Sequence, residues 1–219
     1  MTDLLNIDEF RGVFLKYTKK AFEMLPKINE PYILDIGCGK GLPTLELARL
    51  SDGTIIGIDI DQDALDQFRI KIEKQELSDR IKIMNKSLYE TGFPKEQFDI
   101  LWEEGVLHLL DIKKSLKECF RILKPEGYLV SFETIKWMDH SLEQFPRYGF
   151  QLVDHFLLPE KYWWTNYYSL LEERIKELYQ KYKSSKELES LKSHEREIAM
   201  VKKNPKEFDC GYYISQKVR

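Results

Sequence analysis

The sequence predicts an α/β fold built on a doubly wound, mainly parallel sheet with helices on both faces. Between residues 31 and 133, short apolar runs alternate with segments of helical periodicity. The first of these runs enters a glycine-rich turn that opens a helix. Because neighbouring parallel strands need a crossover connection, the alternation requires helices that cover the sheet.

The individual elements follow from the same patterns. A first helix is expected near the start of the chain, where Phe10, Phe14 and Thr18 share one face. The predicted strands that follow are YILDI, TIIGIDI, RIKIMN, FDILW and GYLVSFE, and the helices between them are LPTLELARL, a segment from about residue 63 to 75, and IKKSLKECFRIL. Two more strands, GFQLVDHFLL and CGYYISQKV, flank a charged segment over residues 159–208. That segment, which includes SSKELESLKSHEREIAMVKK, is rich in helix formers and is expected to be a helical insertion.

Composition narrows the class of protein. Hydrophobic residues make up 42% and charged residues 32% of the 219, which is typical of a globular chain. The net charge of -3 offers no bulk attraction to nucleic acid. No apolar stretch approaches the roughly 20 residues of a membrane span, and the acidic start is unlike a signal peptide, so a cytoplasmic protein is expected. Cys38, Cys119 and Cys210 form no CxxC pair, and no metal site is expected.

The strongest chemical signal is ILDIGCGKG at residues 33–41, with glycines at 37, 39 and 41. Glycine lets the chain turn sharply and lets the backbone approach a ligand, which should leave N–H groups free to donate. The dinucleotide pattern GxGxxG needs its third glycine at position 42, where Leu42 stands. A pyrophosphate cradle, and with it a nicotinamide-dependent dehydrogenase, is disfavoured.

A second signal is Asp59 at the end of the second predicted strand, 22 residues after Gly37. A carboxylate can accept hydrogen bonds from both hydroxyls of a ribose. In such a sheet this position lies beside the glycine turn. The two signals together indicate nucleoside binding.

The segments LDIGCGKG, GIDID and FDILW, in this order and spacing, resemble the class I S-adenosylmethionine-dependent methyltransferases, which have a Rossmann-like fold. LKPEGYLVSFE and GYYISQKV resemble the family's fifth strand and its antiparallel last strand. The resemblance implies a seven-stranded sheet in one domain. Its expected parts are an N-terminal helical cap (1–28), a cofactor-binding core (29–158), a helical insertion (159–208) and the last strand (209–219).

The resemblance also implies S-adenosylmethionine as cofactor and S-adenosylhomocysteine as product. Asp35 and the glycine turn would line its methionine end, Asp59 would hold the ribose and Ile60 would touch the adenine. The family often has an acidic residue after the third strand, and here Ser87 and Leu88 occupy that place. The expected cofactor residues are therefore Asp35, Gly37, Cys38, Gly39, Gly41, Asp59, Ile60, Ser87, Leu88 and Glu103.

The segment WEEGVLHLL after the fourth predicted strand offers Glu103, Glu104 and His108 at the edge of the sheet where ligands bind. One glutamate should contact the methionine part and the other should face the acceptor. The order is open, and Glu103 is provisionally assigned to the cofactor and Glu104 to the substrate. Glu104 and His108 are the candidate bases, although a structural role for His108 among its apolar neighbours is the simpler interpretation.

Aromatic residues in and before the insertion suggest an acceptor pocket. Trp137, Trp163 and Tyr167 are candidates for its wall, with the alternative that Trp163 and Tyr167, four residues apart, anchor the inserted helix. Basic residues between 174 and 206 are interleaved with glutamates, which favours a solvated helix face over an RNA-binding surface. The DPPY or NPPY box typical of many enzymes that methylate nucleic-acid amino groups is absent after FDILW, where WEEG stands.

The predicted function is in-line methyl transfer to a small-molecule acceptor, without a metal. An RNA or protein methyltransferase and a non-catalytic S-adenosylmethionine-binding protein are the alternatives. No membrane or nucleic-acid partner is expected, and the acceptor and the oligomeric state stay open.

Overall fold

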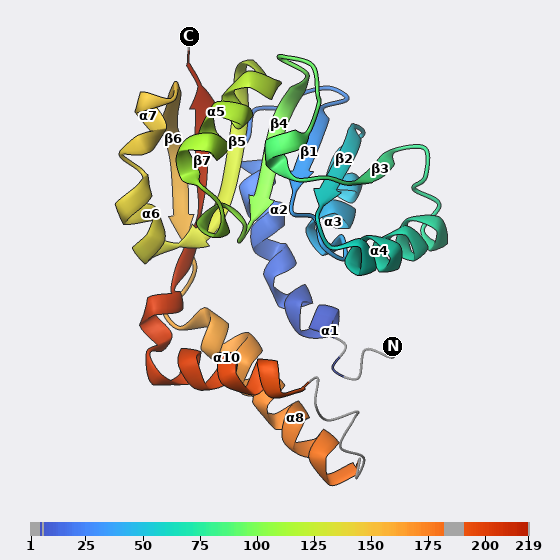
Figure 1. Cartoon of the computed structure of the whole chain (residues 1–219), viewed down its shortest axis with the longest axis vertical. Helices are drawn as coiled ribbons and strands as arrows, with labels where there is room; N and C mark the ends of the chain where they lie inside the picture. The colour runs from blue at the N-terminus through green and yellow to red at the C-terminus, as the bar shows by residue number, and fades with distance from the viewer. Residues whose placement is uncertain (1–4, 6, 182–190, 219) are drawn as a thin grey trace.

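The computed structural model describes residue 5 and residues 7–181 and 191–218. Its centre is a seven-stranded sheet in the order β3-β2-β1-β4-β5-β7-β6 (Figure 1). The strands are β1 (Tyr32–Ile36), β2 (Thr54–Asp59), β3 (Ile81–Asn85), β4 (Phe98–Glu104), β5 (Leu123–Thr134), β6 (Phe150–Leu157) and β7 (Cys210–Lys217). Strands β1 to β5 are parallel, whereas β7 is antiparallel to both β5 and β6. The predicted fold class, including the antiparallel last strand, is confirmed.

The helices also follow the predicted order. They are α1 (Ile7–Arg11), η1 (Gly12–Phe14), α2 (Leu15–Glu23), α3 (Leu42–Leu50), α4 (Gln62–Lys74), η2 (Leu88–Glu90), η3 (Leu107–Leu109), α5 (Ile112–Ile122), α6 (Ile135–Ser141), α7 (Gln144–Arg147), η4 (Trp164–Tyr168), α8 (Ser169–Lys181), α10 (Leu191–Lys203) and η5 (Pro205–Phe208). The first predicted helix is interrupted by the short 3-10 turn η1, so it is shorter than its periodicity suggests.

Side chains alternate across the sheet and build two apolar layers. In β1, Ile33 packs with α2, α3 and α4 on one face, whereas Leu34 packs with α5 on the other. Along β4 the same alternation places Trp102 on the α2 face and Leu101 on the α5 face. The same alternation decides on which face of the sheet each polar residue near a strand end lies.

Local sequence explains where the helices begin. Asp61 accepts a hydrogen bond from the Ala64 amide at the start of α4, and Asp111 caps α5. In α3, Pro43 occupies the first turn, where its missing N–H removes no helical hydrogen bond. Each of these residues starts a crossover helix shortly after a strand. The helices therefore begin at the edge of the sheet where the parallel strands end.

The insertion packs beyond the carboxyl edge of the sheet, next to the N-terminal helices (Figure 1). The aromatic run forms a π-helical turn, η4, before α8. The predicted helix SSKELESLKSHEREIAMVKK is seen as α10 from Leu191, and its residues 184–190 lie outside the described part of the chain. Among the helices of the described residues, none is both long and apolar enough to cross a lipid bilayer.

Candidate cofactor and acceptor site

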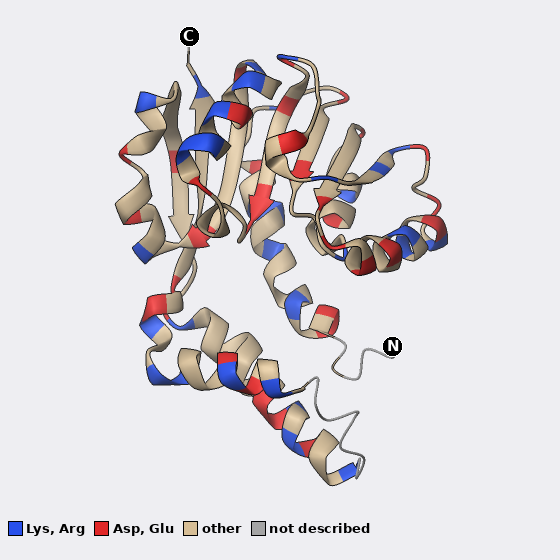
Figure 2. Ribbon diagram, in the orientation of Figure 1, with Lys and Arg blue, Asp and Glu red and all other residues tan. Residues whose placement is uncertain are grey.

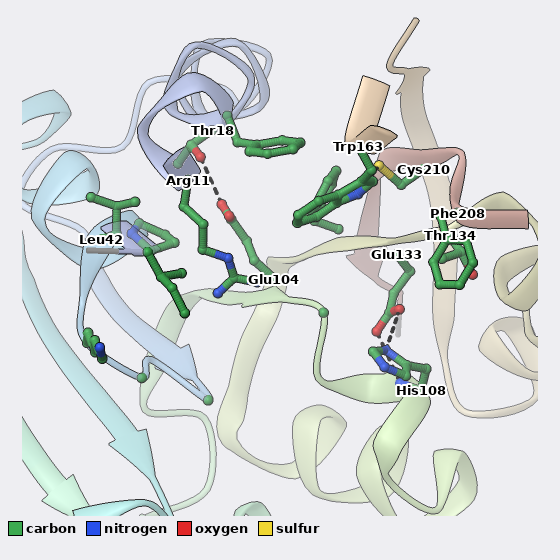
Figure 3. Close-up of a pocket in the computed structure, with 18 of the residues that line it drawn as sticks. Arg11, Thr18, Leu42, Glu104, His108, Glu133, Thr134, Trp163, Phe208 and Cys210 are labelled. Carbon is green, nitrogen blue, oxygen red and sulfur yellow. Dashed lines mark hydrogen bonds and ion pairs between the residues drawn. The ribbon is translucent and has the colours of Figure 1, made fainter. Parts of the chain in front are cut away.

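A cavity of about 830 Å³ lies at the carboxyl ends of β1, β4 and β5. Its walls come from the glycine turn, from α1, η1 and α2, and from the insertion with the start of β7 (Figure 3). This volume is near the upper end of the range for small-molecule sites. The N-terminal helices and the insertion therefore cover the edge of the sheet at which the chemical signals of the sequence gather.

The glycine turn occupies one end of this cavity. Gly37, Cys38, Gly39 and Gly41 all line it, and the three glycines have φ of +70°, +50° and +80°. A Cβ at Gly41 would lie 2.1 Å from the Phe68 ring, whereas a Cβ at Gly39 would meet nothing closer than 4.0 Å. Gly39 is therefore the point at which the backbone is open to a ligand.

The expectation that the amides of this turn are free is wrong for the glycines and Cys38. The Gly37 and Cys38 amides donate to the Ile58 carbonyl, the Gly39 amide donates to Asp59 at 2.7 Å, and Gly41 donates to Cys38. The turn uses these donors to hold the end of β2. Since a pyrophosphate cradle needs free amides, the geometry argues independently against a dinucleotide.

Asp35 lines the same end of the cavity and is 2% exposed. One of its oxygens accepts a hydrogen bond from the hydroxyl of Thr44 in α3. Burial raises the pKa of Asp35 to about 7, the Thr44 hydrogen bond opposes this shift, and the charges of Glu104 and Asp59 add to it. A cation placed beside this carboxyl would favour its ionised form. Sequence analysis did not identify Thr44, whose only sign is a hydroxyl in the first turn of α3.

Asp59 ends β2 beside the turn and is only half-buried. Its two oxygens accept from the Gly39 and Asp61 amides at 2.7 and 2.8 Å. Each carboxylate oxygen has a second lone pair, so both can still accept from a hydroxyl. Its position suits the predicted ribose contact.

The residues predicted at the adenine lie outside the cavity as defined by the described residues. Ile60 is 77% exposed, Leu88 is buried, and the Ser87 hydroxyl accepts from the Tyr89 amide. Ile60 follows β2, and Ser87 and Leu88 follow β3. The adenine contacts of Ile60, Ser87 and Leu88 stay predictions.

The two glutamates of β4 point to opposite faces of the sheet. Glu104 lines the cavity on the α2 face. Glu103 is fully buried on the α5 face, where one oxygen accepts from the Val106 and Leu107 amides at 3.0 and 3.4 Å. The assignment of Glu103 to direct cofactor contact is therefore corrected, because strand alternation turns it away from the cavity.

A single oxygen of Glu104 collects three hydrogen bonds. Thr18 of α2, Trp102 of β4 and Tyr212 of β7 donate to Oε1 at 2.9, 3.0 and 2.8 Å. Burial raises the pKa of Glu104, while these hydrogen bonds and the charge of Arg11 lower it in part. With Oε1 occupied, Oε2 is the oxygen left for a ligand.

Arg11, at the end of α1, extends into the cavity near Glu104 (Figure 3). Its guanidinium carbon lies 5.9 Å from the centre of the Trp163 ring, a cation–π distance. The cavity thus holds a cation near the carboxyl of Glu104, and Asp35 lines the same cavity. Arg11 could not be identified from sequence, because nothing in its helix indicates which side faces the sheet edge.

His108 lies in η3, opposite the glycine turn. Its Nδ1 is 2.8 Å from Oε2 of Glu133, and its amide donates to Oε1 of Glu133 at 3.1 Å. The side chain of His108 is 40% exposed and that of Glu133 is 1% exposed. The Glu133 hydrogen bond raises the pKa of His108 despite partial burial. His108 was predicted from the sequence. Glu133, the second-last residue of the neighbouring strand β5, was not.

The three aromatic candidates differ in whether they line the cavity. Trp137 and Trp163 line the cavity. Trp163 is held by its indole N–H, which lies 3.1 Å from the Cys210 sulfur, and by the Phe14 ring, 4.2 Å away between centroids. Tyr167 is 6% exposed, does not line the cavity of the described residues, and packs edge-on against Trp163. These contacts agree with the alternative role of Tyr167 as an anchor, and its direct contact with a substrate stays a prediction.

Residues 34–131 match a family model described as a methyltransferase domain. This part of the chain is therefore similar to methyltransferase domains. The match runs from within β1 to within β5 and includes the glycine turn, Asp59, Glu104 and His108.

Curated relatives carry the same kind of domain. The chain is 31% identical to the demethylmenaquinone methyltransferase of Lactobacillus johnsonii, over 61% of this chain and 54% of that protein. It is 29% identical to the 27-O-demethylrifamycin SV methyltransferase of Amycolatopsis mediterranei, over 52% of this chain and 42% of that protein. The chain therefore spans about half or less of the length of these relatives.

Solved structures extend the similarity of fold to nearly the whole chain. The cyclase SpnF superposes with a TM-score of 0.81 at 20% identity, over 93% of this chain and 80% of that one. The geranyl diphosphate C-methyltransferase of Streptomyces coelicolor gives 0.66 at 12% identity, over 92% and 78%. At these identities the comparison establishes the architecture, including the insertion, and leaves the reaction to be argued from the site.

Proposed function

We propose that the chain is an S-adenosylmethionine-dependent methyltransferase that acts on a small-molecule acceptor. The observation that carries the proposal is the set of charges at the glycine turn. Arg11 stands near the Glu104 carboxyl, Asp35 lines the same cavity, and Asp59 lies beside the turn. A methionine group carries one carboxylate and one ammonium, and a ribose carries two hydroxyls. These residues supply a partner for each.

The cofactor would be held by residues at this end of the cavity. Arg11 would pair with the methionine carboxylate, and Asp35 with Oε2 of Glu104 would accept from its ammonium. Asp59 would accept from the ribose hydroxyls. When bound, the cofactor supplies an electrophilic methyl carbon on a sulfonium.

The protein's own contribution is alignment and exclusion of water. Trp137, Trp163 and Phe14 form an apolar wall on the acceptor side, and the N-terminal helices and the insertion cover part of the cavity. Holding two reactants in line removes most of the entropic cost of their encounter. His108, the candidate base, also lines the cavity.

Surface charge supports a small acceptor over RNA. Acidic and basic residues alternate along α8 and α10 (Figure 2). Lys176 and Lys202 both pair with Glu172, and Arg174 pairs with Glu177. Cations that are already paired give little net attraction to a phosphate backbone. The names of the relatives, which refer to a demethylrifamycin and a demethylmenaquinone, also agree with a small acceptor.

The test is calorimetric titration with S-adenosylmethionine, S-adenosylhomocysteine and NAD. We expect binding of the first two only, weakened about 10-fold or more in Asp59→Ala because hydrogen bonds to a charged group are lost. Asp63→Ala, an exposed change in the first turn of α4, is the matched control. Binding of NAD alone, or of none of the three, would overturn the proposal. Binding without turnover on any acceptor would leave a non-catalytic binding protein.

A further inference from the structure

His108 is held from the protein interior in one orientation. Both oxygens of Glu133 are used on it, one by the ring nitrogen Nδ1 and one by the backbone amide. Since a carboxylate only accepts, Nδ1 carries a proton, and in the neutral ring Nε2 carries the lone pair. Among the described residues, Nε2 has no hydrogen-bond partner, and the His108 side chain lines the cavity. The ring therefore offers a basic nitrogen to whatever fills the acceptor side.

A second buried carboxyl fixes the turn that carries His108. Glu103 accepts from the Val106 and Leu107 amides, and Glu133 accepts from the next one. Glu103 and Glu133 are the second-last residues of the neighbouring parallel strands β4 and β5, in which Glu103 is paired with Ser131. Three consecutive amides of the turn are thus tied to two strand ends. Such support is what a reacting group needs in order to stay within a few tenths of an ångström of its place.

Each acidic side chain among the described residues of the acceptor side already has a partner in the protein. Of the described residues there, Glu197 accepts from the Tyr168 hydroxyl at 2.6 Å, and Glu207 pairs with Lys136 at 3.1 Å. Glu133 is occupied by His108. The remaining wall is mostly aromatic. A neutral acceptor with an apolar body fits this lining better than a cationic one.

The chemistry of methyl transfer then selects the nucleophile. A carboxylate needs no base, and a thiol with a pKa near 8.5 ionises readily without one. An alkyl ammonium, with a pKa of about 10, has no lone pair to attack with, so it must lose its proton before the new bond begins to form and not during that step. An alcohol or phenol keeps its proton until the new bond begins to form, so it gains most from a base placed in line.

Building on the proposed methyl transfer, we propose that the acceptor is a hydroxyl compound, an alcohol or phenol on an apolar body, with His108 as its base and Glu133 as a positioning residue. Nε2 of His108 takes the hydroxyl proton while the acceptor oxygen bonds to the methyl carbon and the carbon–sulfur bond breaks. The electron pair of that bond stays on sulfur, which becomes a neutral thioether. The positive charge ends on the His108 ring, next to the Glu133 carboxylate, and the proton later leaves to water.

The experiment uses the full chain with S-adenosylmethionine and two matched sets of probes. One set is naphthol, naphthylamine, naphthalenethiol and naphthoic acid, and the other is octanol, octylamine, octanethiol and octanoic acid. Methylated product and S-adenosylhomocysteine are measured by mass spectrometry. We expect transfer to hydroxyl members, a loss of about 100-fold or more in kcat for His108→Gln, and little change in cofactor affinity.

Glu133→Gln tests positioning separately from folding. Glutamine keeps the shape but removes the charge that raises the pKa of His108. In the native enzyme, log kcat should rise with pH up to that raised pKa and then level, and in Glu133→Gln this rise should move to lower pH. A merely structural role would lower kcat without moving the profile. His140→Gln, an exposed histidine on α6, is the control and should match the native enzyme.

The outcomes separate this inference from the function on which it rests. Transfer to an amine, thiol or carboxylic acid in place of the hydroxyl member would overturn the hydroxyl class and leave methyl transfer intact. Transfer to a hydroxyl at an unchanged rate in His108→Gln would overturn the role of His108. An enzyme that binds S-adenosylmethionine yet methylates none of the probes would count against both.

Discussion

Cofactor binding should depend on pH through Asp35, whose pKa in the empty site is about 7 because of burial. If the ammonium of S-adenosylmethionine binds the ionised carboxyl, the observed affinity scales with the ionised fraction. That fraction is about 1/11 at pH 6 and about 1/2 at pH 7, so affinity should rise about fivefold, or about 1 kcal/mol. Binding at pH 6 should release about 0.9 proton per cofactor.

The assay is isothermal titration in two buffers of different ionisation enthalpy, which yields both the affinity and the number of protons released. Asp35→Asn removes the titrating group and should bind more weakly at pH 7, with a shallower dependence on pH. The neighbouring carboxyls Glu104 and Asp59 remain in that variant and report any contribution of their own. No proton release at pH 6, or the same pH dependence in Asp35→Asn, would refute the assignment of Asp35 to the ammonium.

The same pKa has an opposite effect on the stability of the empty protein. The folded state holds the Asp35 proton more tightly than the unfolded chain, where the pKa of an aspartate is about 3.9. The free energy of unfolding should therefore fall on this account as pH rises from about 4 to 7. Saturating cofactor should offset part of this loss, so its stabilising shift in Tm should be larger at pH 7 than at pH 5.5.

Three further changes follow from single contacts. Thr44→Val removes the hydrogen bond that lowers the pKa of Asp35, so the pH midpoint of cofactor binding should move upward; an unchanged midpoint would count against this coupling. Gly41→Ala places a Cβ 2.1 Å from the Phe68 ring at a φ of +80°. It should lower the free energy of unfolding, measured in urea, by about 3 kcal/mol or more. Gly105→Ala, also at positive φ but with open space around the new Cβ, should lower it less. Arg80→Met removes hydrogen bonds to the Ala48, Ser51 and Gly53 carbonyls. It should lower the free energy of unfolding by about 2 kcal/mol. Cofactor affinity should not change, which checks that the effect stays outside the site.

Sequence predicted the strands well because each apolar run had a turn signal at its end. It placed β5 at residues 127–133, whereas the strand begins at Leu123. Leu123 pairs with Phe98 across an irregularity, and Ile100 then pairs with Tyr128. A register shift of this kind depends on the partner strand and leaves no local periodicity to detect.

The residues of the site also differ in how well the sequence predicts them. Asp35 and Asp59 lie at the ends of strands and the glycines follow β1, so position in the chain sufficed to find them. Whether Glu103 or Glu104 faces the cavity depends on the parity of β4, and two adjacent glutamates give no sign of it.

Partners that come from distant segments were harder to predict. Glu133 meets His108 only because β4 and β5 are neighbours and end together. Arg11 and Thr18 reach the site through tertiary packing of amphipathic helices, whose sequence fixes an apolar face but not where that face docks.

The three donors gathered by Glu104 have a consequence for the order of events during synthesis. Thr18 and Tyr212 are 194 residues apart, yet both contact the same oxygen. The segment of β1 to β5 that carries the glycine turn leaves the ribosome long before Tyr212 can reach its place between β5 and β6. In a nascent chain Asp59, the proposed ribose partner, is therefore in place before Glu104 receives its donor from Tyr212. Full cofactor affinity should arise only when β7 inserts between β5 and β6.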